Sequence, residues 1–253
     1  MESSSSAELL VLFDIDGTLL LTDGAGRVAI KQALEAVYGT SGTMEGYNFH
    51  GKTDPQIIVE LMSSAGLEEG DVRARMSEIW PIYLENLHRE LEVRRLEDRI
   101  TVLPGVADLL AALKSEPGVS LGLLTGNIEQ GAKLKLSAAG VPWLFDAGAY
   151  GSDAEVRSEI ARVAVERSRS AVGTPAAVLV VGDTPEDIAC ARAVDALALA
   201  VATGRHETDE LEEAGADAVF VDFGDTEAVL RCIQSLVRGG DGAGETSVNG
   251  GRG

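Results

Sequence analysis

The sequence predicts an α/β protein with a parallel sheet and a second, helical domain inserted after the first strand. Three observations predict it: short apolar runs alternate with helix-like stretches, the first apolar run has no nearby partner, and a long helical block follows that run. Strands and helices that alternate in this rhythm indicate parallel strands covered by helices on both faces. The predicted fold is therefore a Rossmann-like sheet core with an inserted α-helical cap domain.

Five short apolar runs are the predicted strands of this core. The first, residues 9–13 (LLVLF), stops at Asp14 and Gly17, as a buried strand does where it enters a loop. The later runs cover residues 119–124, 177–181, 197–202 and 218–221. The helix-like stretches between and after them cover residues 105–114, 128–139, 154–169, 185–193, 208–214 and 226–237.

Residues 23–102 form the predicted cap domain. This block is helical over 26–38, 54–65 and 72–92, with glycine-rich breaks at 39–46 and 66–70. The predicted core comprises residues 9–22 and 103–238, and the chain would hinge between the two domains near 21–26 and 99–105. Residues 239–253 are glycine-rich with little apolar content, and they are predicted to be disordered.

The charge balance limits the possible partners. The 253 residues include 41 acidic and 21 basic side chains, which give a formal net charge of −20. Such a surface ordinarily serves solubility, and it opposes general binding to nucleic acid or to an anionic membrane. An anionic substrate would therefore need a bound cation or nearby lysine and arginine side chains to enter.

The sequence shows no targeting signal and contains only two cysteines, and both observations favour a location in the cytoplasm. No apolar run is long enough to span a bilayer, and residues 1–8 lack the basic-then-apolar order of a signal peptide. Cys190 and Cys232 lie far apart and outside any C-x-x-C pattern. We interpret both as small buried apolar residues in a reducing compartment.

Polar motifs follow three of the predicted strands. They are Asp14–Thr18 (DIDGT), Thr125–Asn127 (TGN) and Gly182–Asp187 (GDTPED). Because ligands of an open parallel sheet bind just beyond the carboxyl ends of its strands, these carboxylates converge and their repulsion demands a cation. Hard oxygen ligands of this kind suit Mg²⁺. Each residue alone has an ordinary alternative: a turn or helix cap for the aspartates, a first-turn carboxylate for Asp187, and a turn hydroxyl for Thr125.

Together the three motifs resemble those of the haloacid dehalogenase (HAD) superfamily. The resemblance spans roughly residues 9–237 and is closest to phosphoglycolate phosphatase-like members with a helical cap after the first strand. It implies a Mg²⁺-dependent phosphatase that hydrolyses a small phosphate monoester, phosphoglycolate-like or a sugar phosphate. The implied reaction passes through an aspartyl-phosphate.

The resemblance also implies catalytic roles. Asp14 is the expected nucleophile, and Asp16 is the expected acid that protonates the leaving alcohol and then the base that activates water. Thr125 is expected to hydrogen-bond the transferring phosphoryl group.

The same resemblance implies metal ligands and substrate contacts. Asp14, the backbone carbonyl of Asp16, and Asp183 are the expected Mg²⁺ ligands, and Asp187 is expected to support them. The remaining motif residues are expected to contact the substrate: Thr18, Gly126 and Asn127.

One family element departs from its usual form. The superfamily's third motif is normally a lysine ahead of the Gly-Asp strand, but no lysine follows Lys135 in this chain. Arg157 lies at about the right distance and is the predicted catalytic cation, although its forked donor is wider than an ammonium. Lys133 is the alternative, and a solvated helix charge is the ordinary interpretation of either residue.

A loop in the predicted cap supplies further candidates. The segment 49–55 (FHGKTDP) is a glycine-containing turn that leads into a helix, and Asp54 fits the N-cap before Pro55. Cap members of the family hold such a loop over the active site. Lys52 and His50 are therefore predicted substrate contacts.

Other chemistries of the superfamily remain as alternatives. Dehalogenases and phosphonate-cleaving members lack the second aspartate of the first motif, so the presence of Asp16 argues against both. A sugar phosphomutase retains every motif seen here and stays open as the main alternative. A catalytically dead binding module is disfavoured because all the motif aspartates are intact.

Overall fold

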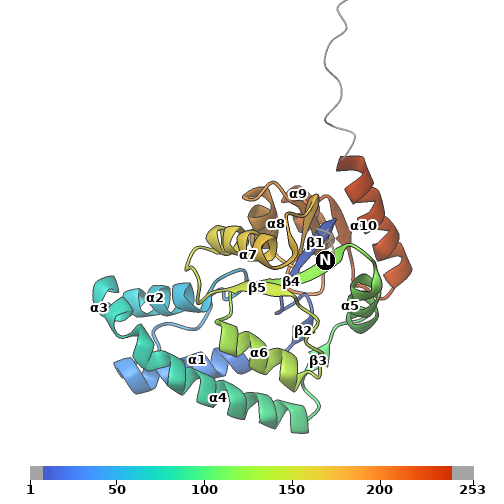
Figure 1. The fold of residues 1–253 in the computed structure, drawn as a ribbon. Helices are drawn as coiled ribbons and strands as arrows, with labels where there is room; N and C mark the ends of the chain where they lie inside the picture. Colours follow the sequence, from blue (N-terminus) through green and yellow to red (C-terminus); the bar gives the residue numbers. More distant parts are fainter. Residues whose placement is uncertain (1–7, 241–253) are drawn as a thin grey trace, which may run out of the picture.

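The computed structural model describes residues 8–240, and it contains a six-stranded parallel sheet with helices on both faces (Figure 1). The strands are β1 Leu9–Phe13, β2 Leu20–Leu21, β3 Thr101–Val102, β4 Val119–Thr125, β5 Ala147–Tyr150, β6 Ala177–Gly182, β7 Leu197–Val201 and β8 Ala218–Phe220. The helices are α1 Ala25–Tyr38, α2 Asp54–Ser64, α3 Glu69–Ala74, α4 Met76–Leu96, α5 Val106–Ser115, α6 Glu129–Ala138, α7 Arg157–Val172, α8 Pro185–Arg192, α9 Thr208–Glu213 and α10 Thr226–Gly240.

The order of the strands explains how the motifs meet. The sheet runs β5-β4-β1-β6-β7-β8, and β1 pairs in parallel with both β4 and β6. Leu9 is in register with Val119 on one side and with Ala177 on the other. The carboxyl ends of these three strands therefore lie side by side, and the loops that follow them share one edge of the sheet.

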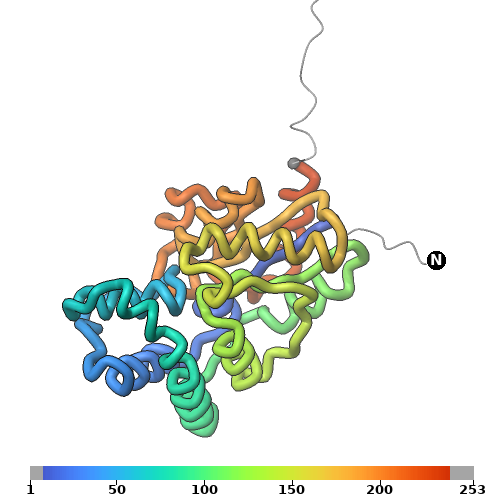
Figure 2. Tube along the Cα trace, turned by 60° about the vertical axis from the view of Figure 1, so that its left-hand side comes forward, coloured from blue at the N-terminus to red at the C-terminus, as the bar shows by residue number. Residues whose placement is uncertain are grey.

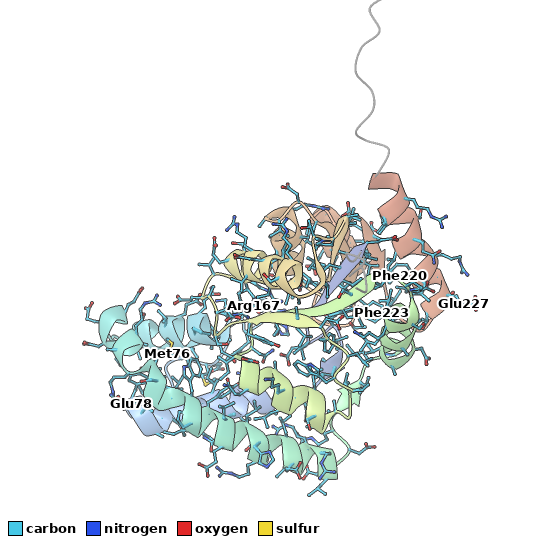
Figure 3. The ribbon with its side chains drawn as sticks, viewed as in Figure 1. Met76, Glu78, Arg167, Phe220, Phe223 and Glu227 are labelled. Atoms are coloured by element: carbon cyan, nitrogen blue, oxygen red, sulfur yellow. The ribbon has the colours of Figure 1, made fainter. Side chains whose placement is uncertain are left out.

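The side chains of β1 alternate between the two faces of the sheet, and a helical layer covers each face. Leu9, Val11 and Phe13 belong to a hydrophobic cluster with α5, α10 and Phe223, which Figure 3 shows beside α5. Leu10 and Leu12 face the opposite layer, where they cluster with α7, α8 and α9. Both faces of the sheet are thus covered, which explains why β1 is apolar at every position.

Helices α1–α4 form a separate block with its own hydrophobic cluster, centred on residues such as Ile58, Tyr83 and Leu87. The block lies beside the sheet layers and against α6, as Figures 1 and 2 show. The chain enters and leaves it through β2 and β3, which pair antiparallel. This short ribbon lies where the sequence predicts the two hinges.

The structure differs from the predicted elements in several places, and the two-residue strands β2 and β3 were not predicted. The helix predicted over 72–92 is two helices, α3 and α4, because the backbone turns at Arg75 just before Met76 and Glu78 (Figure 3). Edge strand β5 (AGAY) was not predicted, since it is short and contains no apolar run. Helix α10 extends to Gly240, so residues 239 and 240, which were predicted to be disordered, are helical, and the rest of the segment predicted to be disordered lies outside the described residues. Within residues 8–240, no helix is both long and apolar enough to cross a membrane.

Candidate active site

The loops after β1, β4 and β6 line one cavity together with residues of the α1–α4 block. The cavity has a volume of 630 Å³, and its lining includes Asp14, Asp16, Thr125 and Arg157. Segments distant in sequence supply these side chains because parallel strands end at the same edge. The volume lies within the range of small-molecule pockets.

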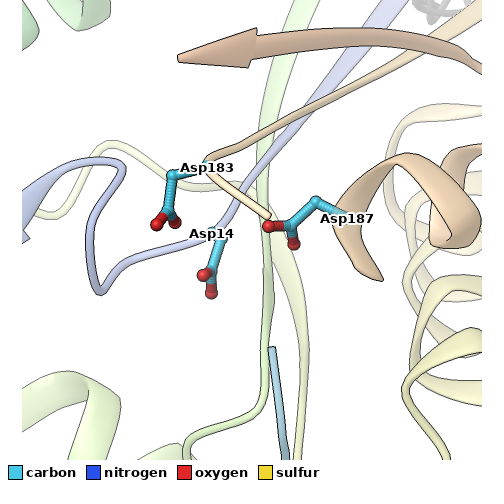
Figure 4. Close-up of side chains that lie close together, drawn as sticks. All are labelled: Asp14, Asp183 and Asp187. Atoms are coloured by element: carbon cyan, nitrogen blue, oxygen red, sulfur yellow. The ribbon is translucent and has the colours of Figure 1, made fainter. Parts of the chain in front are cut away.

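Three buried carboxylates cluster beside the cavity, and Asp14 is the one that lines it. Asp14, Asp183 and Asp187 lie close together (Figure 4), with one oxygen of each within 4.8 Å of the others. Thr18 Oγ1 donates to Asp183 Oδ1 at 3.1 Å, whereas Asp183 Oδ2 is buried without a hydrogen-bond partner. An unpaired buried carboxylate oxygen is costly unless an ion or water satisfies it.

The surroundings of Asp183 fit a cation. A Cβ at Gly17 would fall 2.3 Å from Asp183 Oδ2, and one at Gly204 would fall 1.8 Å from it, so glycines leave open the space around this oxygen. Burial and the neighbouring carboxylates raise the pKa of Asp183 well above its usual value. Burial also raises the pKa of Asp14 to about 6, although Arg157 opposes the shift. Both pKa shifts arise mainly from burial, to which the neighbouring carboxylates add, and a divalent cation would favour the charged form of both groups.

Arg157 supplies the positive charge at the carboxylate cluster. Its Nη2 lies 3.1 Å from Asp14 Oδ2 and 2.5 Å from Asp187 Oδ1, and the side chain is buried. The alternative, Lys133, pairs instead with Glu129 and lies over the ring of Trp143 on an exposed face of α6. The geometry therefore favours Arg157 over Lys133 as the cation beside the predicted nucleophile.

Asp187 is held by the start of α8. Its Oδ2 accepts from the backbone N–H and the hydroxyl of Thr184, and Thr184 in turn caps the helix. Because its other oxygen accepts from Arg157, both carboxylate oxygens already have partners. Asp187 is at once a first-turn carboxylate and the link between α8 and Arg157, which suits a supporting role beside a metal ion.

Asp16 stands in a second network on the cavity wall, where 42% of its side chain is exposed. Lys135 Nζ donates to Asp16 Oδ1 at 2.8 Å and to Oδ2 at 2.6 Å. Asn127 Nδ2 donates to Asp16 Oδ2 at 2.7 Å, and Lys135 Nζ donates to Asn127 Oδ1 at 2.6 Å. Burial raises the pKa of Asp16, but Lys135 and Asn127 outweigh it, so the pKa lies below its usual value.

Lys135 is the member of this network that the sequence analysis missed. It is 5% exposed, although a lysine on a helix usually reaches solvent. One signal was available: Lys135 lies three residues after Ala132 and next to Leu136, so it falls on the buried face of α6. A lone lysine on the apolar face of a helix points to a buried anion.

Asn127 and Thr125 belong to the same network. Asn127 Nδ2 donates to Thr125 Oγ1 at 2.8 Å, and the Asn127 backbone N–H donates to it at 3.4 Å. Because Thr125 Oγ1 accepts from Asn127, its own hydroxyl hydrogen is free to point into the cavity. The polar atoms of Asn127 are themselves occupied, so its side chain orients Thr125 and Asp16.

Thr18, an expected substrate contact, lies away from the cavity. Its side chain is fully buried, it bonds to Asp183, and it does not line the cavity. The tight turn at Gly17, with φ at +85°, directs the chain so that Thr18 lies against Asp183. Thr18 therefore supports Asp183.

The predicted cap loop lies directly over the loop after β4. A Cβ at Gly126 would fall 2.2 Å from the carbonyl oxygen of Lys52, so only glycine allows this approach. The Lys52 ammonium lines the cavity but forms an ion pair with Glu60 and lies 4.5 Å above the ring of Tyr47. His50 also lines the cavity and is exposed.

Asp54 has a different place from the predicted N-cap. Thr53 caps α2 by accepting from the backbone N–H of Gln56, and Asp54 is the first helical residue. The Asp54 backbone N–H donates to Gly126 O at 2.8 Å, and Asp54 Oδ2 accepts from the Ile128 N–H at 2.9 Å. Asp54 thus ties the α1–α4 block to the loop that carries Thr125.

Burial of Asp54 predicts a pH-dependent stability. Burial raises its pKa from 3.8 to about 6, so the folded state holds this proton more tightly than the unfolded state does. The associated stability is complete below pH 3.8 and is lost as the pH rises through about 6. Relative to Asp54→Asn, the wild type should lose about 2 kcal/mol between pH 4.5 and pH 8.

Urea unfolding of both proteins at several pH values tests this expectation. Asp71→Asn, which removes an exposed carboxylate from α3, is the control for the loss of one charge. A constant difference in unfolding free energy between wild type and Asp54→Asn across this pH range would contradict it.

The sheet topology and the three motif loops at its carboxyl edge define a hydrolase of the haloacid dehalogenase-like class. The chain belongs to this family, because the family's model, described as a haloacid dehalogenase-like hydrolase, matches residues 9–195. A phosphoglycolate phosphatase from Synechococcus elongatus is 32% identical to it over 148 residues, which are 57% of this chain and 66% of that relative. The chain therefore spans just under two thirds of that relative's length.

Solved structures confirm the predicted fold class. A hydrolase from Pseudomonas syringae superposes with a TM-score of 0.65 at 21% identity, covering 91% of this chain and 99% of that one. CbbY from Rhodobacter sphaeroides, solved in complex with phosphate, superposes with a TM-score of 0.62 at 22% identity and covers 86% and 95%. At these identities the likeness concerns the fold alone.

Proposed function

We propose that this protein is a Mg²⁺-dependent phosphatase that hydrolyses a small-molecule phosphate monoester, phosphoglycolate-like or a sugar phosphate. One observation carries the proposal: Asp14, paired with Arg157, and Asp16, paired with Lys135, face the same cavity. One carboxylate is thereby available to attack phosphorus and the other to move the proton. The match to a phosphoglycolate phosphatase supports the substrate class.

In the first step, an Asp14 oxygen attacks phosphorus and forms an aspartyl-phosphate while the bond from phosphorus to the leaving oxygen breaks. Asp16 gives its proton to that leaving oxygen. In the second step, water attacks the same phosphorus, Asp16 takes the proton, and the bond to Asp14 breaks. Splitting the hydrolysis in this way replaces one difficult displacement with two easier ones.

The other side chains of the site stabilise charge and hold geometry. Thr125 donates its free hydroxyl hydrogen to a phosphoryl oxygen, and Arg157 offsets the charge of Asp14 and Asp187. Asn127 and Lys135 keep the Asp16 carboxylate in one orientation. These contacts exist before substrate arrives, so little reorganisation is needed during the reaction.

The donor set fits Mg²⁺, which prefers a few carboxylates together with waters and a phosphate oxygen. Asp14, Asp183 and the backbone carbonyl of Asp16 would hold the ion, with Asp187 supporting them through Arg157 and Thr184. When bound, Mg²⁺ neutralises the charge of the phosphoryl group and allows a carboxylate to approach it.

Release of inorganic phosphate from p-nitrophenyl phosphate tests the proposal. We expect multiple turnover with Mg²⁺, loss of turnover with EDTA, and recovery when Mg²⁺ is restored. A panel of glycolate, sugar, nucleotide and cofactor phosphates then ranks natural substrate classes. Transfer of the phosphoryl group between two positions of a sugar, followed by ³¹P NMR without release of phosphate, would instead support the phosphomutase alternative. No Mg²⁺-dependent turnover of any ester would overturn the proposed activity.

A further inference from the structure

The cations that line the cavity fall into two groups. Lys52, Lys135 and Arg157 each form an ion pair with a carboxylate. Arg27 and Arg205 also line the cavity, but no carboxylate among residues 8–240 lies within 4.0 Å of either guanidinium group. Two positive charges therefore remain uncompensated at the cavity of a chain whose formal net charge is −20.

The two arginines come from different parts of the fold and meet the same segment of the α1–α4 block. Arg27, in the first turn of α1, donates to Met44 O at 3.0 Å and lies 5.2 Å from the ring centre of Phe49. Arg205, in the loop after β7, has Nη1 3.5 Å from Asn48 Oδ1. Among residues 8–240, each guanidinium is thus held only by neutral partners, and its other donors remain free.

Most exposed arginines elsewhere in the described residues pair with acids. Exposed arginines on α3, α4 and α7 pair with nearby acids, as Arg73 does with Glu155 and Arg167 does with Asp153. Among residues 8–240, Arg89, Arg169 and Arg238 also form no ion pair, but none of them lines the cavity. An arginine that lines the catalytic cavity without one retains its charge for an anionic ligand.

The size of the cavity also indicates a substrate larger than phosphoglycolate. Its volume of 630 Å³ lies in the middle of the range of small-molecule sites, about 300 to 1,000 Å³. Phosphoglycolate, a two-carbon ester, would fill a small part of that volume. Ile30, Tyr47, Phe49 and Ile57 add apolar wall near the arginines, which suits the carbon skeleton of a larger leaving group.

Building on the proposed phosphatase activity, we propose that Arg27 and Arg205 form a second anion subsite. The substrate is then a phosphate monoester whose leaving group is larger than glycolate and carries a second anionic group, either a carboxylate or another phosphate. That group binds at the arginines while the reacting phosphoryl group lies at Asp14. The subsite supplies local positive charge, which attracts an anionic substrate that the acidic surface otherwise repels.

Matched pairs of esters test this subsite. 6-Phosphogluconate and glucose 6-phosphate differ at C1 by a carboxylate, and fructose 1,6-bisphosphate and fructose 6-phosphate differ by a phosphate. We expect kcat/KM to be at least about tenfold higher for the anionic member of one pair, which identifies the anion. Arg27→Met combined with Arg205→Met should reduce that preference about tenfold, mainly through KM. Arg89→Met combined with Arg169→Met removes two exposed arginines of α4 and α7 outside the cavity and is the matched control for charge.

The outcomes separate this proposal from the proposed activity. Turnover of p-nitrophenyl phosphate with no preference within either pair would overturn the subsite and leave the phosphatase intact. A preference that survives in the double arginine variant would equally overturn it. If no ester is hydrolysed, calorimetric binding of the same pairs decides: tighter binding of the anionic member, lost in the double variant, supports the subsite, and equal binding refutes it.

Discussion

Replacing Asp14 with Asn is expected to abolish turnover while the fold stays intact. The amide has the shape of the carboxylate but no nucleophilic charge, so the first displacement on phosphorus cannot occur. We expect a loss of at least about 10⁴-fold in kcat, since removal of the covalent nucleophile of other enzymes lowers kcat by more than that. The fold should survive because Arg157 keeps its ion pair with Asp187 and the amide can still accept from a neighbour.

Steady-state phosphate release and thermal unfolding of the Asp14→Asn variant measure the two parts of this expectation. Acid quenching of the wild type during turnover of ³²P-labelled substrate should trap a phosphoenzyme that hydroxylamine cleaves, as it does other acyl phosphates. The variant should form none. Multiple-turnover hydrolysis by a correctly folded Asp14→Asn protein would show that another group attacks phosphorus.

Much of the sheet could be predicted from sequence because its strands carry their own signal. A strand that is buried on both faces must be apolar at every position, as residues 9–13 are, and a polar motif marks where it ends. The same signal is absent from β5, an edge strand with a glycine at its second position. Once the strands were predicted, the motifs that follow them could be expected to lie close together, because a parallel sheet brings the carboxyl ends of its strands to one edge.

Predicting the side chains that complete the site requires tertiary structure. Lys135 is separated from Asp16 by more than a hundred residues, and only the packing of α6 beside the β1 loop brings them together. The ion pair between Lys52 and Glu60 likewise depends on how the 49–53 loop folds back over α2. The local sequence shows that a residue is charged, but it does not show which oppositely charged residue will lie beside it in the folded protein.

The role of Asp54 shows the same limit in a different form. Its position before Pro55 is typical of a helix start, and α2 does begin there. The neighbouring Thr53 takes the capping role, which frees the Asp54 carboxylate to accept from Ile128 in another part of the chain. The local pattern predicted the helix, whereas the contact between domains depended on the arrangement of the α1–α4 block.

Asp16→Asn is expected to slow both chemical steps. The amide can neither protonate the leaving oxygen nor take a proton from water, and general acid–base help contributes about 10² to 10⁴ in rate. The loss should be largest for alkyl phosphates, whose alcohols leave poorly without a proton, and smaller for p-nitrophenyl phosphate. A cost below about threefold on an alkyl ester would show that Asp16 is not the acid and base.

Lys135→Met extends the same test to the side chain that holds Asp16. The change keeps a long apolar stem on the buried face of α6 but removes both hydrogen bonds to the Asp16 carboxylate. Loss of such a supporting contact typically costs about 10- to 100-fold in activity. We expect this loss to depend on the leaving group in the way that the Asp16→Asn loss does.

Combining the two substitutions distinguishes positioning from a general effect on the fold. If Lys135 acts through Asp16, then Lys135→Met should cost little in a protein that already carries Asp16→Asn, so the two losses will not add. A structural role would give the same loss in both backgrounds and on every leaving group. Comparing kcat for an alkyl phosphate and for p-nitrophenyl phosphate in all four proteins supplies both readouts. Additive losses that are equal for the two esters would mean that Lys135 stabilises α6 rather than the acid and base.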